Sequence, residues 1–492
     1  MKKFIISIDQ GTTSTRSILF DKFGKEIFVS QKEFKQYFPK DGWVEHDPEE
    51  IWNKTLQTLK DVIKRSLYLK GEILTIGITN QRETTLIWDK KTGKCIYNAI
   101  VWQDRRTYDF CSMLKKKGLE RIIKSKTGLL LDPYFSSSKI NWIISNVPSA
   151  KKLIKQNRIL FGTIDTFLIW RLTNRQVHAT DATNASRTML YNIKKNRWDN
   201  KILKIFKIPY QILPIVKNSA DKFGFTHKSI TGISYPITGV IGDQQAAVIG
   251  QGCFSKGSTK ITYGTGAFIM MNTGNKIIYT KSKLLSTICY RLNNKTTYAV
   301  EGSIFIAGAV IQWLRDNLKI IKNAKQTVSI LKKTKSNNGV YFVPAFTGLG
   351  APHWRPDARG IITGITRNSE KHDIIRAALE SIVYQSIDLL QAMENDGLKP
   401  NLIKVDGGVT QNNLFNQFLS DLSNLKVLKP RTKEATALGA ALIAGYGVGI
   451  FKNLTQLSKK NIINKQYLPK INNKYRLNLL NGWNQAIRKT IK

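Results

Sequence analysis

Two short polar turns, each set between two apolar runs, most constrain how this chain can fold. The first turn is Asp-Gln-Gly-Thr-Thr-Ser-Thr-Arg at residues 9–16, between the apolar runs 3–8 and 17–20. Apolar runs of this composition are typical of strands, and the polar segment is typical of a tight turn. A turn crowded with backbone N–H groups and hydroxyls can surround a phosphate chain, and Asp9 offers oxygen ligands for Mg²⁺. An ordinary polar hairpin turn is the alternative.

The second turn, Gly264-Thr265-Gly266, repeats this design about half a chain later. Strands are expected on either side of it, at residues 260–263 and 267–271. The repetition predicts an α/β protein of two related halves, each presenting one phosphate-binding hairpin to a cleft between them. Actin and the hexokinase-like ATPases have this arrangement. Residues 252–259 do not form a P-loop, because Ser258 stands where such a loop needs Lys.

Length and composition place the chain among globular proteins with more than one domain. The 492 residues suffice for two large cores, and 42% of them are hydrophobic. Asp9 ends the first apolar run too early for a signal peptide, and we find no apolar stretch long enough to span a bilayer. The four cysteines lack the spacing of a metal site or a disulfide framework. We therefore expect a cytoplasmic protein with reduced thiols and no membrane insertion.

The formal net charge of +43 raises the alternative of a nucleic-acid-binding protein. The lysines are scattered along the chain, however, and do not gather in one arm or stripe. We therefore expect no specific nucleic-acid site. The charge can still speed the encounter with a polyanion such as ATP.

Two charged segments follow expected strands, where the ligand crevice of an α/β fold lies. Arg82 and Glu83 come after a buried strand at 73–79, and an arginine beside a carboxylate can hold two hydroxyls of a polyol. Asp243 comes after a strand that ends at Gly242 and begins a helix, which suits a general base. The alternatives are a surface ion pair for Arg82 and Glu83, and a plain helix N-cap for Asp243.

The remaining segments give expectations that place these candidates. Asp47 and Pro48 begin a helix that Gly71 closes. The polar segment 181–187 is expected to be a surface turn, and a loop near the cleft is the alternative. Further expected elements are a hairpin formed by 86–88 and 98–102, a helix at 136–145, a helix at 303–318, a long helix at 373–395, a Gly-Gly turn at 407–408, a helix at 412–423 and a closely packed segment at 436–445. The polar stretch from residue 471 onward gives no prediction.

Seven motifs in this order resemble the FGGY family of carbohydrate kinases, and the resemblance runs essentially from end to end. They are Asp9-Gln-Gly-Thr-Thr-Ser14, Gly42-Trp-Val-Glu-His-Asp-Pro48, Gly77-Ile-Thr-Asn-Gln-Arg-Glu-Thr84, Asn184-Ala-Ser-Arg-Thr-Met189, Gly242-Asp-Gln-Gln-Ala246, Tyr263-Gly-Thr-Gly266 and Pro344-Ala-Phe-Thr-Gly-Leu-Gly-Ala-Pro352. Each motif alone is a weak signal, and their combination is specific.

The resemblance implies two ribonuclease-H-like domains, 1–250 with the acceptor site and first phosphate turn, and 251–492 with the second phosphate turn and adenine site. It also implies transfer of phosphate from ATP to glycerol, with Mg²⁺ near Asp9 and Asp243 as the base. The implied glycerol contacts are Arg82, Glu83, Trp102, Tyr134, Asp243, Gln244 and Phe268. The implied nucleotide contacts are Thr12, Thr13, Ser14, Arg16, Thr265, Gly308, Gln312, Gly408 and Asn412. A homo-oligomer, dimer or tetramer, is expected on the same ground.

Other functions stay open at this point. One alternative is another FGGY kinase that acts on a pentulose or a larger polyol, and another is an actin-like ATPase without a small-molecule acceptor. The resemblance also bears on regulation, because many bacterial members that phosphorylate glycerol bind fructose bisphosphate through a Gly-Gly-x-Arg loop. Here Ser234 replaces that Arg and the paired glycines are missing. We therefore expect no response to this bisphosphate.

Overall fold

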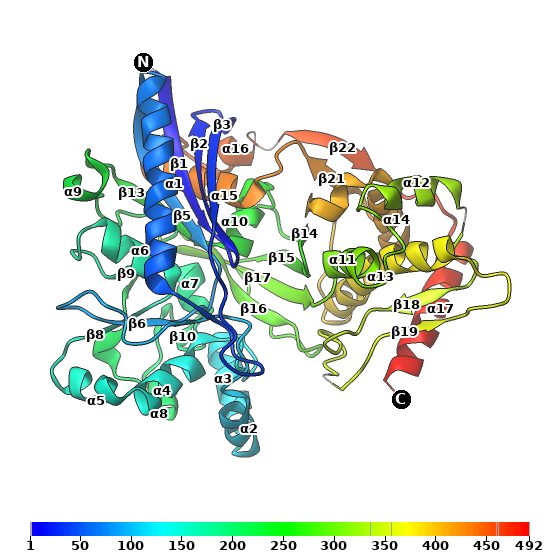
Figure 1. The fold of residues 1–492 in the computed structure, drawn as a ribbon, viewed down its shortest axis with the longest axis horizontal. Coiled ribbons are helices and arrows are strands. Elements are labelled where there is room, and N and C mark those ends of the chain that lie inside the picture. Colours follow the sequence, from blue (N-terminus) through cyan, green and yellow to red (C-terminus); the bar gives the residue numbers. More distant parts are fainter. Residues whose placement is uncertain (1, 335, 356, 459, 461, 492) are drawn as a thin grey trace.

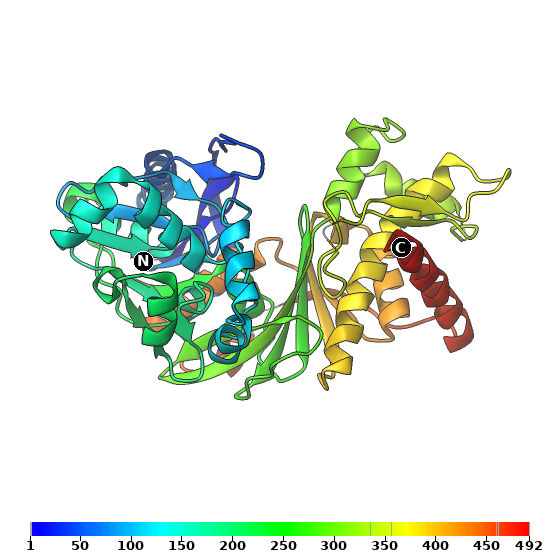
Figure 2. The same cartoon turned by 90° about the horizontal axis from the view of Figure 1, so that it is seen from below.

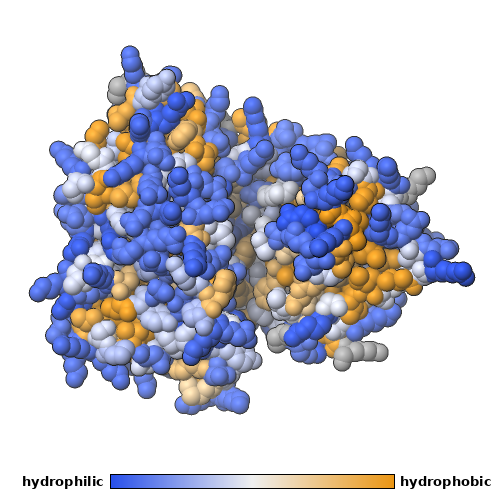
Figure 3. Space-filling model, in the orientation of Figure 1, coloured by the Kyte–Doolittle hydropathy of each residue, from blue (hydrophilic) through white to orange (hydrophobic). Residues whose placement is uncertain are grey.

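The computed structural model describes residues 2–334, 336–355, 357–458, 460 and 462–491, which form two lobes. Each lobe is built on one large mixed sheet (Figure 1), and the lobes stand side by side when seen from below (Figure 2). The space-filling surface is hollowed between them (Figure 3). We call the part around the five-stranded sheet the first lobe and the part around the seven-stranded sheet the second lobe.

The sheet of the first lobe has the strand order β13-β5-β1-β2-β3. The strands β1, β2 and β3 form an antiparallel meander, and β5 and β13 run parallel to β1. Their bounds are β1 Lys2–Gln10, β2 Ser14–Asp21, β3 Glu26–Glu33, β5 Gly71–Asn80 and β13 Ile237–Gly242. The predicted strand–turn–strand at the start of the chain is thus confirmed.

The sheet of the second lobe has the strand order β16-β17-β15-β14-β20-β21-β22. Its five inner strands repeat the topology of the first sheet, because β14, β15 and β17 form an antiparallel meander and β20 and β21 run parallel to β14. The bounds are β14 Ser258–Tyr263, β15 Ala267–Gly274, β16 Leu285–Leu292, β17 Lys295–Ile304, β20 Leu402–Gly407, β21 Val427–Pro430 and β22 Ile463–Tyr467. The prediction of two related α/β halves is confirmed.

The register of the parallel strands brings their carboxyl ends together. In the first sheet Asn80 of β5 lies opposite both Gln10 of β1 and Gly242 of β13. In the second sheet Tyr263 of β14 lies opposite Gly407 of β20. The polar segments that follow these strands therefore emerge at one edge of each sheet.

The helices of the first lobe begin with α1, which Asp47 caps by accepting the N–H of Glu49 as predicted. The helix ends at Tyr68 with Leu69 as its C-cap, and Gly71 starts β5, so the expectation that Gly71 closes the helix is wrong. The helices are α1 Pro48–Tyr68, α2 Tyr108–Lys116, α3 Glu120–Thr127, α4 Ser136–Asn146, α5 Pro148–Lys155, α6 Ile164–Leu172, α7 Ala182–Ser186, α8 Asn200–Phe206, α9 Lys228–Thr231 and α10 Asp243–Gly250, with the 3₁₀ turn η1 Tyr210–Ile212.

Short strands occupy the rest of the first lobe, and the expected hairpin of 86–102 is confirmed in part. Its arms share antiparallel backbone hydrogen bonds between Ile87 and Ile96 and between Thr85 and Ile100, while β6 also pairs with β8 and β7 with β4. These strands are β4 Glu45–His46, β6 Leu86–Asp89, β7 Ala99–Ile100, β8 Ile159–Gly162, β9 Ala179–Asp181, β10 Tyr191–Asn192, β11 Arg197–Trp198 and β12 Ile215–Lys217.

The helices of the second lobe include α13, whose capping box joins Glu370 and Asp373. The helix α11 begins five residues later than expected, because residues 303 and 304 still belong to β17. The stretch from residue 471, which gave no prediction, contains α17 with Trp483 buried against the core. The elements are α11 Gly308–Asp316, α12 Gln326–Lys333, β18 Tyr341–Val343, β19 Ile361–Thr363, α13 Lys371–Asn395, the 3₁₀ turn η2 Gly408–Gln411, α14 Asn413–Ser423, α15 Ala435–Gly447, α16 Leu454–Ser458 and α17 Asn473–Thr490.

One helix crosses from the second half of the sequence to the first lobe. The helix α15 lies on β1, β5 and β13 and packs against α10. Glycines allow this approach: a Cβ on Gly439 would lie 1.9 Å from the carbonyl oxygen of Ala246, and one on Gly250 would lie 1.8 Å from that of Ala435. The close packing expected for 436–445 is confirmed. The division of the chain into domains at residues 250 and 251 stays a prediction.

The described parts of the chain contain no helix that is both long and apolar enough to cross a membrane. The four cysteines are free, as expected.

Replacing Gly439 by Ala tests the contact between α10 and α15. The new methyl group meets backbone, which cannot rotate away, so we expect a loss of about 3 kcal/mol in the free energy of unfolding. As a control, Gly449→Ala meets no atom within 4 Å and has only a positive φ of 78°, which should cost about 1 kcal/mol. Urea unfolding compares the two, and an equal loss in both variants would contradict the close contact.

Candidate active site

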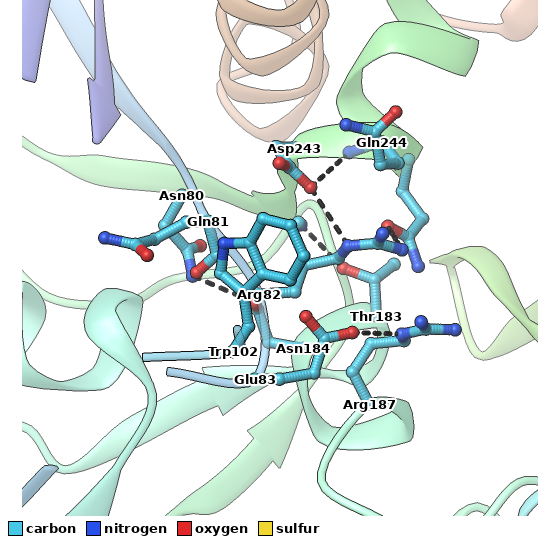
Figure 4. A network of polar contacts seen from close by, with 12 residues as sticks. Asn80, Gln81, Arg82, Glu83, Trp102, Thr183, Asn184, Arg187, Asp243 and Gln244 are labelled. Atoms are coloured by element: carbon cyan, nitrogen blue, oxygen red, sulfur yellow. Dashed lines mark hydrogen bonds and ion pairs between the residues drawn. The ribbon is translucent and has the colours of Figure 1, made fainter. Parts of the chain in front are cut away.

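The strand ends of the first sheet bring Arg82, Glu83 and Asp243 together. Arg82 follows β5, and Asp243 is the first residue of α10 directly after β13. Nε of Arg82 lies 3.0 Å from Oδ1 of Asp243 (Figure 4). Gly242, not Asp243, is the N-cap of α10, so the alternative of a plain Asp N-cap does not describe this residue. The carboxyl group of Asp243 thus lies at the N-terminus of α10, next to the Arg82 guanidinium.

A buried network of alternating positive and negative side chains extends from Asp243 into the protein. It includes one residue of the second lobe. Nη1 of Arg82 lies 2.5 Å from Oε2 of Glu301 on β17, and Oε1 of Glu301 accepts from Nη2 of Arg187 at 2.9 Å. Nε of Arg187 then donates to Oε1 of Glu83 at 2.6 Å. The four inner residues are at most 3% exposed. Arg82 and Glu83 are therefore not a surface ion pair, and each finds its main partner elsewhere.

Burial and the neighbouring opposite charges together set the pKa values of this buried network. Burial pushes the pKa of Glu301 upward, but Arg187 and Arg82 outweigh it and lower this pKa to about 2. Burial lowers the pKa of Arg82, and the surrounding carboxylates reverse that effect and raise it well above its ordinary value. For Glu83 the balance differs, because burial raises its pKa against the opposing arginines. A further hydrogen-bond donor at Glu83 would therefore stabilise its charged form and lower its pKa.

Two features at the inner end of this network suit the binding of a polar ligand. Nη1 of Arg187 is buried and has no hydrogen-bond partner among the described residues. Glu83 has a φ of +61°, in the left-handed region that side chains other than glycine rarely adopt. A buried donor without a partner is destabilising, so a polar ligand that satisfies it binds favourably.

Three aromatic rings, taken from both lobes, line one side of this network. The ring of Trp102 lies 5.6 Å from that of Tyr134 and 6.2 Å from that of Phe268, which comes from β15 of the second lobe. The Arg82 guanidinium lies 6.0 Å from the Phe268 ring, and that of Arg187 lies 5.6 Å from the Tyr134 ring. Apolar walls beside charged groups suit a small molecule with both C–H and O–H faces.

Each polar turn is closed by a backbone hydrogen bond that a glycine donates. The N–H of Gly11 donates to the carbonyl of Ser14 at 2.9 Å, and that of Gly264 donates to the carbonyl of Gly266 at 2.8 Å. Thr13 and Thr265 are exposed at the tips. The first turn touches the aromatic wall, because Nε1 of Trp102 donates to Oγ1 of Thr12 at 3.0 Å.

Asp9 and Arg16 face each other behind the first turn. Nη2 of Arg16 lies 2.6 Å from Oδ2 of Asp9, and its Nη1 lies 2.5 Å from Oε2 of Glu434. Burial raises the pKa of Asp9 while Arg16 opposes the rise, and Asp243 is close enough to raise it further. Asp9, Asp243 and the first turn therefore share one region.

The residues expected at the nucleotide gather at the strand ends of the second sheet. The N–H of Gly308 donates to the carbonyl of Gly264 at 3.0 Å, so α11 begins against the second turn. Gly408 follows the end of β20, and Gly407 before it has a φ of +95°. Asn412 caps α14, and its Nδ2 is buried without a partner among the described residues. Gln312 is exposed one turn into α11.

Sequence reasoning missed three charged residues of this region. The segment 181–187 is not a surface turn, because β9 and α7 are buried and Arg187 is wholly inaccessible. Glu301 lies inside a largely buried strand. A carboxylate within an apolar run is a sequence signal that could have identified it. Lys260 of β14 donates through Nζ to Oε1 of Gln244 and, at 3.1 Å, to Oγ1 of Thr262, and burial lowers its pKa to about 8.

The fold and the site together define a class. A duplicated ribonuclease-H-like sheet with one glycine-containing hairpin turn in each copy, facing a shared region between two lobes, belongs to the actin- and hexokinase-type proteins. Within this class the chain belongs to the FGGY family of carbohydrate kinases. The N-terminal domain of that family matches residues 4–250, and the C-terminal domain matches residues 259–448.

Full-length relatives support the assignment. A glycerol kinase of Rhizobium meliloti (strain 1021) is 52% identical, over 100% of this chain and 99% of its own length. A glycerol kinase of Clostridium beijerinckii is 51% identical, over 99% of each chain. The crystal structure of Plasmodium falciparum glycerol kinase with ADP is 40% identical and superposes with a TM-score of 0.95, over 100% of this chain and 99% of that one. A gluconate kinase of Lactobacillus acidophilus, 22% identical with a TM-score of 0.89, shares the fold.

The change Glu301→Gln tests the buried chain of charges. It leaves Arg82 and Arg187 without their shared carboxylate, and we expect a loss of about 3–5 kcal/mol in the free energy of unfolding at neutral pH. The exposed pair Arg315–Asp316 provides the control, since Asp316→Asn should leave the unfolding midpoint unchanged. Equal effects of the two changes would contradict the role of Glu301.

Acid unfolding provides a second measurement of the same group. The pKa of Glu301 is depressed from 4.5 to about 2 in the folded protein, so its stabilisation is present above pH 4.5 and is lost as the pH falls from 4.5 towards 2. The Glu301→Gln variant lacks this contribution at every pH. Between pH 4.5 and 2 its stability should therefore fall less steeply than that of the wild type, and parallel curves would contradict the assignment.

Proposed function

We propose that this chain transfers the γ-phosphoryl group of ATP to a terminal hydroxyl of glycerol. The observation that carries the proposal is the hydrogen bond from Trp102 to Thr12, which joins an aromatic-walled polar pocket to a phosphate-binding turn. A hydroxyl held against this wall lies beside the turn that receives the phosphates. The names of the full-length relatives support glycerol as the acceptor, and the ADP complex of the Plasmodium falciparum enzyme supports ATP as the donor.

Polar side chains bind the hydroxyl groups of the acceptor, and aromatic rings contact its carbon atoms. Arg82 donates to one hydroxyl and Glu83 accepts from another, which also relieves the raised pKa of Glu83. Tyr134 and Gln244 add polar contacts, and Trp102 and Phe268 cover the carbon chain. The Trp102 ring lies 5.6 Å from that of Tyr134 and 6.2 Å from that of Phe268, and a wall of these rings suits a short polyol.

Asp243 acts as the general base. Its carboxylate accepts the proton of the attacking hydroxyl while that oxygen forms its bond to the γ-phosphorus. Arg82 keeps the carboxylate in place through the 3.0 Å contact to Oδ1. Arg82 thus orients both the acceptor and the base.

The phosphate chain lies between the two turns. Thr12, Thr13 and Ser14 receive it from the first lobe and Thr265 from the second, and Arg16 neutralises charge on the transferred group. The adenosine part lies against Gly308, Gln312, Gly408 and Asn412, where the unpaired Nδ2 of Asn412 supports a hydrogen bond to the nucleotide. Closure of the lobes excludes water, which would otherwise accept the phosphoryl group.

The residues present fit Mg²⁺ in the form that nucleotide enzymes use. The described residues hold no cluster of three or more metal-binding side chains. Asp9 and the neighbouring Asp243 suit an ion that takes one or two carboxylates and completes its shell with phosphate oxygens and water. Asp9 would hold the ion, which supplies charge neutralisation on the phosphates when bound.

A panel of acceptors tests the proposal. ADP release is measured with glycerol, erythritol, xylitol, ribulose and xylulose at equal concentrations. We expect the highest kcat/KM with glycerol. Preference for a pentulose would assign the chain to another branch of the family, and release that no acceptor stimulates would favour an actin-like ATPase.

The change Asp243→Asn removes the base and keeps a side chain of the same shape. We expect kcat to fall by roughly a hundred-fold to ten-thousand-fold. Nucleotide affinity, measured by calorimetry with ADP, should change little because Asp243 is not among the adenosine contacts. Turnover near that of the wild type would remove Asp243 from this role.

Regulation by fructose bisphosphate is expected to be absent. Oγ of Ser234 donates to the carbonyl of Thr226 at 2.9 Å, so it is already engaged within its loop. A bisphosphate needs charged, forked donors, which Ser234 does not supply. Initial rates at subsaturating glycerol should not change as the bisphosphate is raised to millimolar concentration. Saturable inhibition that Lys228→Ala removes would show that other residues form an effector site.

The assembly and location of the protein complete the proposal. We infer a cytoplasmic homo-oligomer, and light scattering coupled to size-exclusion chromatography at micromolar concentration measures its mass. A monomer at every concentration would contradict the inferred assembly.

A further inference from the structure

Lys139 is a buried cation outside the network described above. It lies in the first turn of α4, and its side chain is wholly inaccessible. It forms no ion pair with any carboxylate of the described residues within 4 Å. Removing a charge from water is costly unless hydrogen bonds replace the lost hydration. The position of this ammonium group therefore needs an explanation.

Three consecutive backbone carbonyls surround the ammonium. Nζ donates to the oxygens of Pro133 at 2.6 Å, Tyr134 at 2.7 Å and Phe135 at 3.3 Å. A lysine has three N–H donors, and all three are used. Residues 133–135 form a turn before α4, in which the N–H of Tyr134 also donates to Oδ1 of Asp132 at 2.9 Å. The convergence of three carbonyls on one atom adds three hydrogen bonds that hold the path of this turn.

This segment carries one of the rings of the proposed acceptor pocket and a second link to it. The ring of Tyr134 lies against Trp102 and Arg187. One residue further on, Oγ of Ser136 donates to the carbonyl of Glu83 at 2.9 Å. The backbone that Lys139 holds thus supports both Tyr134 and the strained backbone of Glu83.

The electrostatic environment agrees with this arrangement. Burial lowers the pKa of Lys139 to about 8, while Asp104, Glu83 and Asp132 favour its charged form. The group is therefore an ammonium with three donors at neutral pH. A neutral side chain of the same length cannot satisfy three carbonyls.

We propose that Lys139 is a positioning residue that sets the depth of the acceptor pocket by fixing the backbone that carries Tyr134. The inference rests on the proposed function of the site and adds a determinant of acceptor selectivity to it. Without the ammonium the three carbonyls separate and the Tyr134 ring moves off Trp102. The pocket then holds a short acceptor less well and admits a longer one.

The change Lys139→Met keeps the length of the side chain and removes its donors. The acceptor is whichever compound of the panel the wild-type protein phosphorylates best, so the test does not depend on that compound being glycerol. We expect the KM for this acceptor to rise about ten-fold or more, because small displacements at a site have large effects, while the KM for ATP changes less than about two-fold. The kcat/KM ratio of the next longer polyol to this acceptor should increase.

A matched control separates positioning from general destabilisation. Ser138→Ala breaks the buried contact of 2.8 Å between Ser138 and Thr107, on the same helix turn, without touching residues 133–135. We expect it to lower stability and leave both KM values unchanged. Lys139→Gln, which keeps an N–H donor in reach, serves if Lys139→Met does not fold, and it should show a smaller change in the same direction.

A double-mutant cycle with Tyr134→Ala decides whether Lys139 acts through Tyr134. In the Tyr134→Ala background, Lys139→Met should change the acceptor KM by less than about two-fold, because the ring that it positions is gone. An equal increase in both backgrounds, or an equal rise in the KM values for ATP and acceptor, would overturn the proposal. Failure of the wild-type protein to phosphorylate any acceptor would overturn the proposed function instead.

Discussion

The ionised carboxylate of Glu301, held between Arg82 and Arg187, is the contact on which the arrangement of the site depends. Glu301 belongs to β17 of the second lobe, and both arginines belong to the first. Because all three are almost wholly buried, neither lobe can keep its share of the charge without the other. The same contact fixes Arg82 for Asp243 and fixes Arg187 for Glu83. The carboxylate of Glu301 therefore links the packing of the two lobes to the positions of Arg82, Asp243 and Glu83 in the proposed site.

The duplicated sheet explains why so many functional groups meet in one place. In each lobe the strands parallel to the first strand of the meander end at the same edge, and the hairpin turn of the meander lies at that edge too. One copy contributes the proposed acceptor pocket and the proposed base, and the other contributes the contacts expected for the nucleoside. Each copy adds one phosphate turn. The two sheets share one topology, but the segments that follow their equivalent strands differ in sequence. These differences allow the two sheets to carry two different binding sites.

Much of the fold could be predicted because local patterns decide it. The strand–turn–strand units, the Asp47 cap and the helix after Gly242 all depend on residues close in sequence, and the structure confirms them. The hairpin of 86–102 is formed only in part, because β6 and β7 also pair with distant strands, which no local pattern reveals. Arg187 and Lys260 were missed for a related reason. Their polarity alone favours the surface, and only tertiary partners make their burial possible. The roles assigned to individual site residues stay predictions.

The position of α15 has a consequence for how the protein is made. The first sheet is complete at Gly242, but the helix that covers one of its faces ends only at Gly447. The ribosome must therefore add about two hundred residues after Gly242 before α15 can cover that apolar face. During this interval the nascent first lobe presents Ile5, Ile18 and Phe20, the residues that later pack against α15. The first lobe can therefore reach its final packing only after α15 has been synthesised.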